Sequence, residues 1–200
     1  SQTMQNRMNW VMEVGSNHSF FNRINSGFDD SGWEGSIGAS LYATDNEQPY
    51  SQFDSQSGSF HLSRQVSENL KFDFLSLGSK SNVNYPGNVK SFSYPIEGQF
   101  QEIEEILLSP GVQIKIEDWK VKAFYCFSAD NLIGKDSFSD TTYDADTNAL
   151  DFQVNGAVTD GVEIVLGGSY EEDSFYKKEN STNIVDINKK ADSESIFALS

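Results

Sequence analysis

The sequence predicts an all-β chain, an antiparallel meander of about ten to eleven strands. The strands would form a partial transmembrane β-barrel, an open curved sheet with short periplasmic turns and long extracellular loops. Apolar and polar residues alternate along most of the chain, as in strands with one apolar face. Many stretches run to roughly ten residues, close to the length of a tilted membrane-spanning strand. Short and long polar connections also follow one another in turn, as in outer-membrane barrels.

Each strand is predicted from its own alternating stretch. In residues 149–158, Leu150, Phe152 and Val154 share one face and polar residues occupy the other. The same pattern places ten strands near residues 10–15, 18–28, 33–42, 59–66, 70–78, 103–116, 119–129, 149–158, 162–172 and 194–200, with a possible further strand before Trp10. Charged residues expected to face a wet interior are Glu34, Asp73, Glu105, Lys120, Lys122, Asp151 and Glu163.

The connections are predicted to differ at the two ends of the sheet. Tight turns are expected at residues 29–32, 67–69, 117–118 and 159–161, which carry the Asp, Asn, Ser and Gly that short hairpins favour. Long polar segments are expected near residues 43–58, 79–102, 130–148 and 173–193. One connection, Ser16-Asn17, is short where a long loop is due. A soluble β-sandwich would also alternate, but it has no reason to place its long loops at one end.

Composition excludes several classes of protein. Mean hydropathy is −0.49, and no apolar run approaches the roughly 18 residues that a transmembrane helix needs. The net charge of −16 argues against nucleic-acid binding. The single cysteine, Cys126, excludes an internal disulfide framework and a cysteine zinc cluster. We expect Cys126 to point inward beside Phe124 and Ser128 as a small inert side chain.

The order of these segments resembles the N-terminal part of the barrel of a TonB-dependent outer-membrane receptor. The resemblance is carried by Val11–Ser16, Phe20–Gly27, Gly35–Tyr42, Leu70–Phe74 followed by Tyr85-Pro86-Gly87-Asn88, Leu107–Val112 and Trp119–Tyr125. The family barrel has about twenty-two strands. The resemblance therefore implies that residues 1–200 are one partial barrel domain, about half of a barrel, with the plug and the C-terminal barrel strands absent.

The same resemblance implies a function and partners. The chain would be a fragment of a receptor in a Gram-negative-type cell outer membrane, which takes up a siderophore, cobalamin or a similar scarce nutrient by active transport. Its partners would be outer-membrane lipid, the plug domain and remaining barrel of the parent chain, and the TonB complex through the missing N-terminal region. The alternatives are a passive porin-like or structural barrel, and a soluble β-rich adhesin or carbohydrate-binding module.

No enzyme is predicted, because no catalytic constellation emerges. His18 and His61 are far apart, and no Gly-x-Ser-x-Gly elbow occurs. Ligand contacts are instead predicted for aromatic residues of the expected extracellular loops, because aromatic rings supply rigid contact area. These residues are Tyr50, Phe53, Tyr85, Phe92, Tyr94, Phe138 and Tyr143. The alternative is that they pack loop against loop or lie in an interfacial girdle.

No cofactor is predicted apart from a possible calcium ion. The segment from Asp130 to Asp146 is acidic, and its candidate ligands are Asp136, Asp140, Asp144 and Asp146. Clustered carboxylates suit calcium, and the resemblance to cobalamin receptors implies a calcium-binding loop. The spacing is not that of an EF-hand, and a solvated loop is the alternative.

Overall fold

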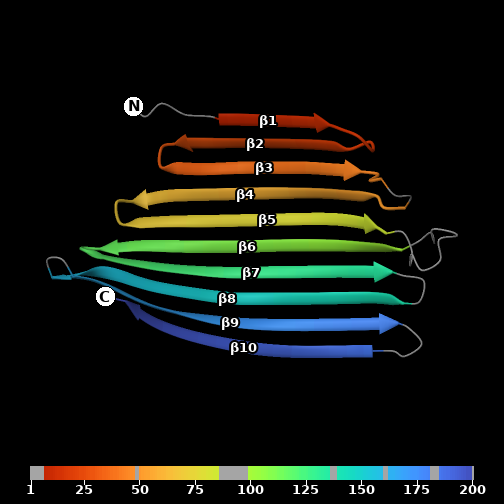
Figure 1. The fold of residues 1–200 in the computed structure, drawn as a ribbon. Coiled ribbons are helices and arrows are strands. Elements are labelled where there is room, and N and C mark those ends of the chain that lie inside the picture. Colours follow the sequence, from red (N-terminus) through yellow and green to blue (C-terminus); the bar gives the residue numbers. More distant parts are fainter. Residues whose placement is uncertain are drawn as a thin grey trace.

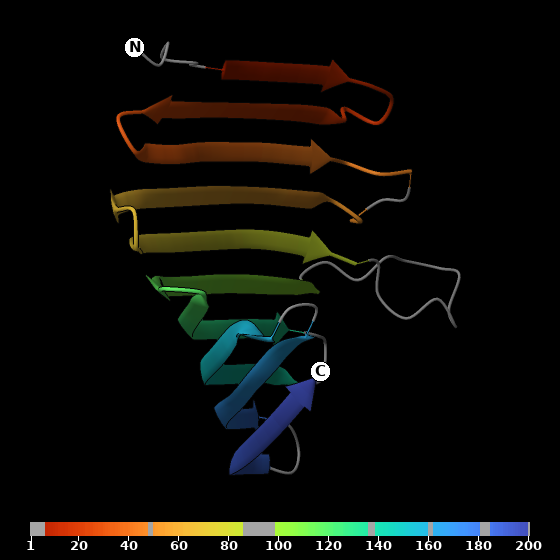
Figure 2. The same ribbon diagram turned by 90° about the vertical axis from the view of Figure 1, so that its left-hand side faces the viewer.

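The computed structural model describes residues 7–47, 50–85, 99–135, 139–159, 162–180 and 185–199. They form a single sheet of ten antiparallel strands in chain order, each hydrogen-bonded to the next (Figure 1). The strands are β1 (Arg7–Val14), β2 (Phe20–Asp30), β3 (Trp33–Thr44), β4 (Phe53–Ser67), β5 (Leu70–Asn84), β6 (Phe100–Ile116), β7 (Trp119–Lys135), β8 (Asp140–Thr159), β9 (Val162–Asn180) and β10 (Val185–Leu199). The sheet is curved and open, with β6–β10 turned out of the plane of β1–β5 (Figure 2).

The sheet has no second layer. Within the described ranges, no hydrophobic side chain is buried, and large apolar side chains such as Trp10, Leu150 and Ile196 are 64%, 50% and 93% exposed. In a two-layer sandwich these side chains would pack against an opposite sheet. The sandwich alternative is therefore not the fold of this chain. In the part that the structure describes, no helix is long and apolar enough to cross a membrane.

The two ends of the sheet carry connections of different length, as predicted. At one end, which we call the turn end, the strands are joined by residues 31–32, 68–69, 117–118 and 160–161. At the other, the loop end, they are joined by residues 15–19, 45–52, 85–99, 136–139 and 181–184. Ser31 and Gly32 both have positive φ, 50° and 81°, which is the geometry of a tight hairpin turn whose twist matches the strands.

The strands are longer at the loop end than the sequence predicts. Among the described residues there are ten strands, as predicted, and the possible further strand before Trp10 is the start of β1. The predicted loops at 130–148 and 173–193 are largely strand, since β7 continues to Lys135 and β9 to Asn180, and the loop predicted at 79–102 begins only after Asn84, where β5 ends. Near the loop end polar residues lie on both faces of these strands, and the few apolar ones, such as Phe175 and Tyr176, do not recur at every second position on one face. The alternation that reveals a strand is absent there, and the sequence reads as loop.

The register assigns every side chain to one of two faces, because direct cross-strand partners lie on the same side of a sheet. One face includes Leu150, Phe152 and Val154, and we call it the outer face. The opposite, inner face carries all seven charged residues predicted to face a wet interior. It follows, for example, from the partners Glu34 and Ser63, Ser63 and Asp73, and Asp73 and Gly111.

Candidate functional site on the inner face

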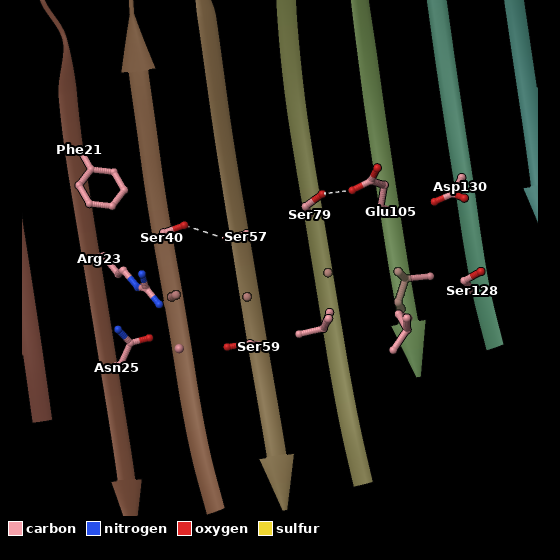
Figure 3. Close-up of a pocket in the computed structure, with 17 residues that line it drawn as sticks. Phe21, Arg23, Asn25, Ser40, Ser57, Ser59, Ser79, Glu105, Ser128 and Asp130 are labelled. Atoms are coloured by element: carbon pink, nitrogen blue, oxygen red, sulfur yellow. Dashed lines mark hydrogen bonds between the residues drawn. The ribbon is translucent and has the colours of Figure 1, made fainter. Parts of the chain in front are cut away.

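The middle of the inner face is lined by small hydroxyl side chains. Ser40, Ser57 and Ser79 are direct partners on β3, β4 and β5, and the Oγ atoms of Ser40 and Ser57 share a hydrogen bond of 2.8 Å (Figure 3). Together with Gly38 and Ser59 they line a groove of about 600 Å³. Because these side chains are short, they leave space on the inner face for an occupant.

Charges of opposite sign flank the groove. Arg23 on β2 lies on one side, and Glu105 on β6 and Asp130 on β7 lie on the other (Figure 3). Ser79 Oγ donates a 2.8 Å hydrogen bond to Glu105 Oε2. Glu105 and Asp130 are direct cross-strand partners, an arrangement of like charges that is destabilising unless a donor or cation lies between them. The groove can therefore orient an occupant that presents donors on one side and acceptors on the other.

A second hollow, near the turn end, is basic. It measures about 410 Å³ and is lined by Lys71, Lys115 and Lys120. Lys115 and Lys120 are direct partners, while Lys71 and Lys122 both oppose Gln113. We call these four lysines the lysine patch. Lys71 lies 3.3 Å from Asp73, and the described residues supply no ion pair for the other three. The chain has a net charge of −16, whereas the lysine patch is a local cluster of positive charge. Carboxylates of a partner would stabilise this cluster.

The loop end of the inner face is aromatic. The rings of Tyr42 and Phe53 lie 5.7 Å apart, and those of Tyr143 and Phe175 lie 6.2 Å apart. Between these pairs in strand order, Tyr85 donates a 2.8 Å hydrogen bond to Gln101 Oε1. Burial raises the pKa of the Tyr85 phenol above its ordinary value. We call these five residues the aromatic rim.

A lysine joins the rim on β9. Lys177 Nζ lies 5.2 Å from the centre of the Tyr143 ring, a cation–π contact, and 2.9 Å from Glu179 Oε2. The ammonium group is therefore held between the Tyr143 ring and the Glu179 carboxylate on the inner face. This end of the inner face therefore offers both aromatic surface and a cation.

Three of the seven aromatic residues predicted to contact ligand belong to the rim. Phe53 and Tyr143 lie in strands rather than loops, Tyr85 directly follows β5, and Tyr50 lies in the 45–52 connection. Phe92, Tyr94 and Phe138 lie outside the described residues. The sequence analysis missed Tyr42 and Phe175. These two residues could be found only from the register between strands, which places Tyr42 diagonally beside Phe53 and Phe175 diagonally beside Tyr143.

The described part of the acidic segment is mostly strand, with β7 ending at Lys135 and β8 beginning at Asp140, which corrects the loop geometry expected for calcium there. Asp140, Asp144 and Asp146 lie on the outer face of β8, and Asp136 lies outside the described residues. Asp144 accepts a hydrogen bond from Asn131, and Asp146 accepts one of 3.4 Å from Ser174. In the described ranges, no group of three or more His, Cys, Asp or Glu side chains could hold a metal ion.

The histidines and the cysteine have ordinary surroundings. His18 Nδ1 lies 2.8 Å from Asp45 Oδ2 and links the 15–19 and 45–52 connections. His61 Nε2 lies 3.9 Å from Asp73 Oδ1 on the inner face. Cys126 shares that face with Phe124 and Ser128, because its direct partner is Ala149 and theirs are Asp151 and Thr147.

Comparison with known proteins shows which solved structures share this fold. No family model and no curated protein sequence matches the chain. The copper transporter OprC superposes with a TM-score of 0.77 at 12% identity, over 98% of this chain and 34% of its own. The siderophore receptor PiuA from Acinetobacter baumannii superposes with 0.71 at 9% identity, over 96% and 39%.

The ferric preacinetobactin receptor BauA, also from Acinetobacter baumannii, gives a TM-score of 0.68 at 13% identity, over 92% of this chain and 32% of its own. The chain has the fold of a partial TonB-dependent receptor barrel. The chain spans about a third of the length of the structures that it matches. The match confirms the predicted fold class. The similar structures are named as a transporter and receptors, which fits the prediction of no enzyme.

Proposed function

We propose that this chain forms part of the wall of an outer-membrane receptor that takes up a scarce nutrient. The observation that carries the proposal is the single sheet, whose outer face exposes apolar side chains and whose inner face is polar. An uncovered apolar sheet face is stable in contact with hydrocarbon, and a polar inner face is stable against water or a hydrated domain. A β-barrel in the outer membrane provides both environments.

The nutrient that we propose is a metal complex, with a ferric siderophore as the first candidate. Three of the similar structures are named for copper, siderophore or ferric siderophore uptake. In this chain the aromatic rim would supply rigid contact area, and Lys177 would attract the negative charge of a metal chelate. Cobalamin is the other candidate that the sequence raised. It would make the same aromatic contacts, but its binding would depend less on attraction to Lys177.

Two partners follow from this function. A plug domain would fill the interior and contact the groove and the lysine patch, and its facing surface would carry carboxylates that complement the lysines. The TonB complex would act through that domain and supply the energy of transport. The volume of the groove and the positive charge of the lysine patch support a plug domain as a partner. The similarity in fold to TonB-dependent receptors supports the TonB complex as the other.

Uptake in a Gram-negative host tests the function. Cells that lack their own siderophore receptors would express the complete receptor and receive an iron-55-labelled ferric siderophore, with labelled cobalamin as the second arm. We expect accumulation that requires TonB and stops when an uncoupler dissipates the proton gradient. Accumulation that persists without TonB would indicate a passive barrel. Recovery of the protein from the aqueous fraction without detergent would indicate a soluble module.

A further inference from the structure

We propose that the lipid surface crosses the outer face obliquely. β1–β3 would then end at the lipid surface, and the loop ends of β7–β10 would rise beyond it as an extracellular wall. The inference rests on the proposed membrane location and adds where the membrane lies on this chain. It follows from comparing outer-face residues that are hydrogen-bonded neighbours on successive strands.

One row of direct partners crosses all ten strands and changes character part-way. The row begins at Trp10 on β1 and Ile24 on β2, and it remains apolar or glycine as far as Ala129 on β7. From there its members are Asp146, Ser174 and Lys190 on β8, β9 and β10. The same row therefore passes from a surface suited to hydrocarbon to one suited to water.

In each row nearer the turn end, the change falls at the same strand pair or at a later one, although the row through Phe127 also contains Ser26 and Ser76. One row nearer the loop end, it falls between Leu41 on β3 and Gln56 on β4. One row nearer the turn end than the first, it falls between Phe127 on β7 and Asn148 on β8.

At the next row the change falls between two partners on the last strand pair, Tyr170 on β9 and Glu194 on β10. One row further on, the row is still apolar at Ile196 on β10. The boundary thus lies nearer the turn end on the later strands, with two successive rows changing between β7 and β8.

The slope of the boundary matches the tilt of strands in a membrane barrel. The change at β3–β4 and the change at β9–β10 are three row steps of two residues and six strand steps apart, which gives an average shift of about 1 residue per strand, or roughly 3.4 Å along the strand. Set against a strand spacing of about 4.8 Å, that shift corresponds to a tilt of roughly 35°, at the lower end of the 35–45° range of membrane barrels. A boundary that is level with a flat membrane would have this slope. Solvation alone gives no reason for it.

One polar residue within the apolar part is satisfied locally. Asn22 on β2 lies between Met12 and Leu41 on the outer face, and its Oδ1 accepts a 2.7 Å hydrogen bond from Trp10 Nε1. A paired amide can lie near hydrocarbon, whereas an unpaired one costs several kcal/mol.

The wall beyond the lipid is polar on its outer face and tallest at the last strands. On β5 and β6, Lys80 Nζ lies 2.9 Å from Glu102 and 2.6 Å from Glu104. On β8 the polar stretch from Asn148 to Asp140 measures about 25 Å along the strand, which at this tilt is roughly 20 Å above the lipid. Its inner face carries Tyr143, so this part of the rim would meet a ligand outside the membrane.

Cysteine accessibility tests the oblique boundary. In the complete barrel that contains this chain, with Cys126→Ser as background, Ile24→Cys and Ser174→Cys place reporters on the same row. A membrane-impermeant maleimide added to intact cells should label position 174 and leave position 24 unlabelled. Equal labelling at the two positions would overturn the inference. Phe152→Cys, which lies inside the apolar part, is the control for membrane insertion, and its labelling would instead contradict the proposed function.

Fluorescence gives a second measurement that needs no cysteine. In a complete barrel in which Trp33, Trp119 and every tryptophan outside residues 1–200 are replaced by Phe, Trp10 is the single indole, and Ser174→Trp in a barrel that also carries Trp10→Phe is its partner on the same row. Lipids brominated on their acyl chains should quench Trp10 and leave the indole at 174 unquenched. Equal quenching of the two would again contradict the oblique boundary.

Discussion

At the scale of single residues, glycines opposite aromatic rings shape the sheet. In four direct cross-strand pairs an aromatic ring lies over the glycine opposite it, namely Phe28 with Gly35, Gly111 with Phe124, Trp119 with Gly156, and Gly167 with Phe197. A Cβ added at any of these glycines would lie 2.4 to 2.5 Å from a ring atom. Each ring therefore covers its glycine, and only a residue without a side chain permits that approach.

Gly167→Ala is expected to destabilise the barrel by about 1–3 kcal/mol. The new Cβ would lie 2.4 Å from Phe197 and 2.8 Å from the Phe152 carbonyl oxygen, and the backbone atom cannot move aside as a side chain can. Gly58→Ala is the matched control, because its nearest neighbour would be 3.9 Å away. Urea unfolding in lipid vesicles measures both, and equal stability of the two variants would contradict the packing argument.

Tyr143→Ala is expected to weaken ligand binding by about fivefold to tenfold, since truncating a buried interface aromatic costs about 1 kcal/mol or more. Tyr176→Ala is the matched control, because Tyr176 lies on the outer face as the direct partner of Asp144. Titration of purified receptor with the ferric siderophore, followed by protein fluorescence, gives both affinities. An equal loss of affinity in the Tyr176 and Tyr143 variants would contradict a role of the aromatic rim in binding.

Tyr85 is expected to ionise at higher pH than an exposed tyrosine. Burial disfavours the phenolate and raises the pKa of Tyr85, so the neutral form that bonds Gln101 persists as pH rises through the ordinary value. This contribution to stability is complete below that value and is lost as pH rises through the raised pKa. Alkaline titration followed by ultraviolet absorbance should lose its late-ionising component in Tyr85→Phe. An unchanged titration curve would contradict the assignment.

At the scale of the element, β8 consists of two parts with different surroundings. From Leu150 toward the turn end its outer face is apolar, with Leu150 and Phe152 50% and 47% exposed. From Asn148 to Asp140 its outer face is polar. One continuous strand therefore passes from a lipid environment to water, and its sequence pattern changes where its surroundings change.

Val154→Arg is expected to destabilise the folded barrel by about 2–4 kcal/mol, because a charged side chain would then face the middle of the hydrocarbon layer. Asn148→Arg, on the same strand and the same face, should change stability by about 1 kcal/mol or less, as near the interface. Folding into lipid vesicles across a urea gradient compares the two. Equal costs would place both residues in the same environment.

The same division explains which parts of the strands could be predicted. The halves nearer the turn end alternate, as Leu150–Val154 does, and the sequence located them along with the tight turns. The halves nearer the loop end, such as Asp140–Asn148, carry polar residues on both faces, with Tyr143 and Ala145 the only exceptions among them, and were predicted as loops. Strand continuation there depends on backbone pairing with β7 and β9, which leaves no periodic signal in the residues.

At the scale of the whole molecule, the charge distribution predicts how the interior is filled. A double charge reversal in the lysine patch, Lys120→Glu with Lys122→Glu, should loosen a plug that carries facing carboxylates. Larger single-channel conductance in planar bilayers is the expected result. Lys178→Glu, on the outer face of β9 opposite Thr142, is the control and should leave conductance unchanged. Unchanged conductance in the double variant would exclude the patch as a plug contact.

The sequence alone determined the local properties of this protein: which residues alternate, where the tight turns lie, and which seven charged side chains lie opposite the apolar face of their own strands. These properties depend on neighbours along the chain, since strand periodicity and turn chemistry are local. Only the tertiary structure decided the register, and with it the aromatic rim, the lysine patch and the slope of the apolar boundary. Each of these joins residues on different strands, and backbone hydrogen bonds between strands, rather than spacing along one strand, bring them together.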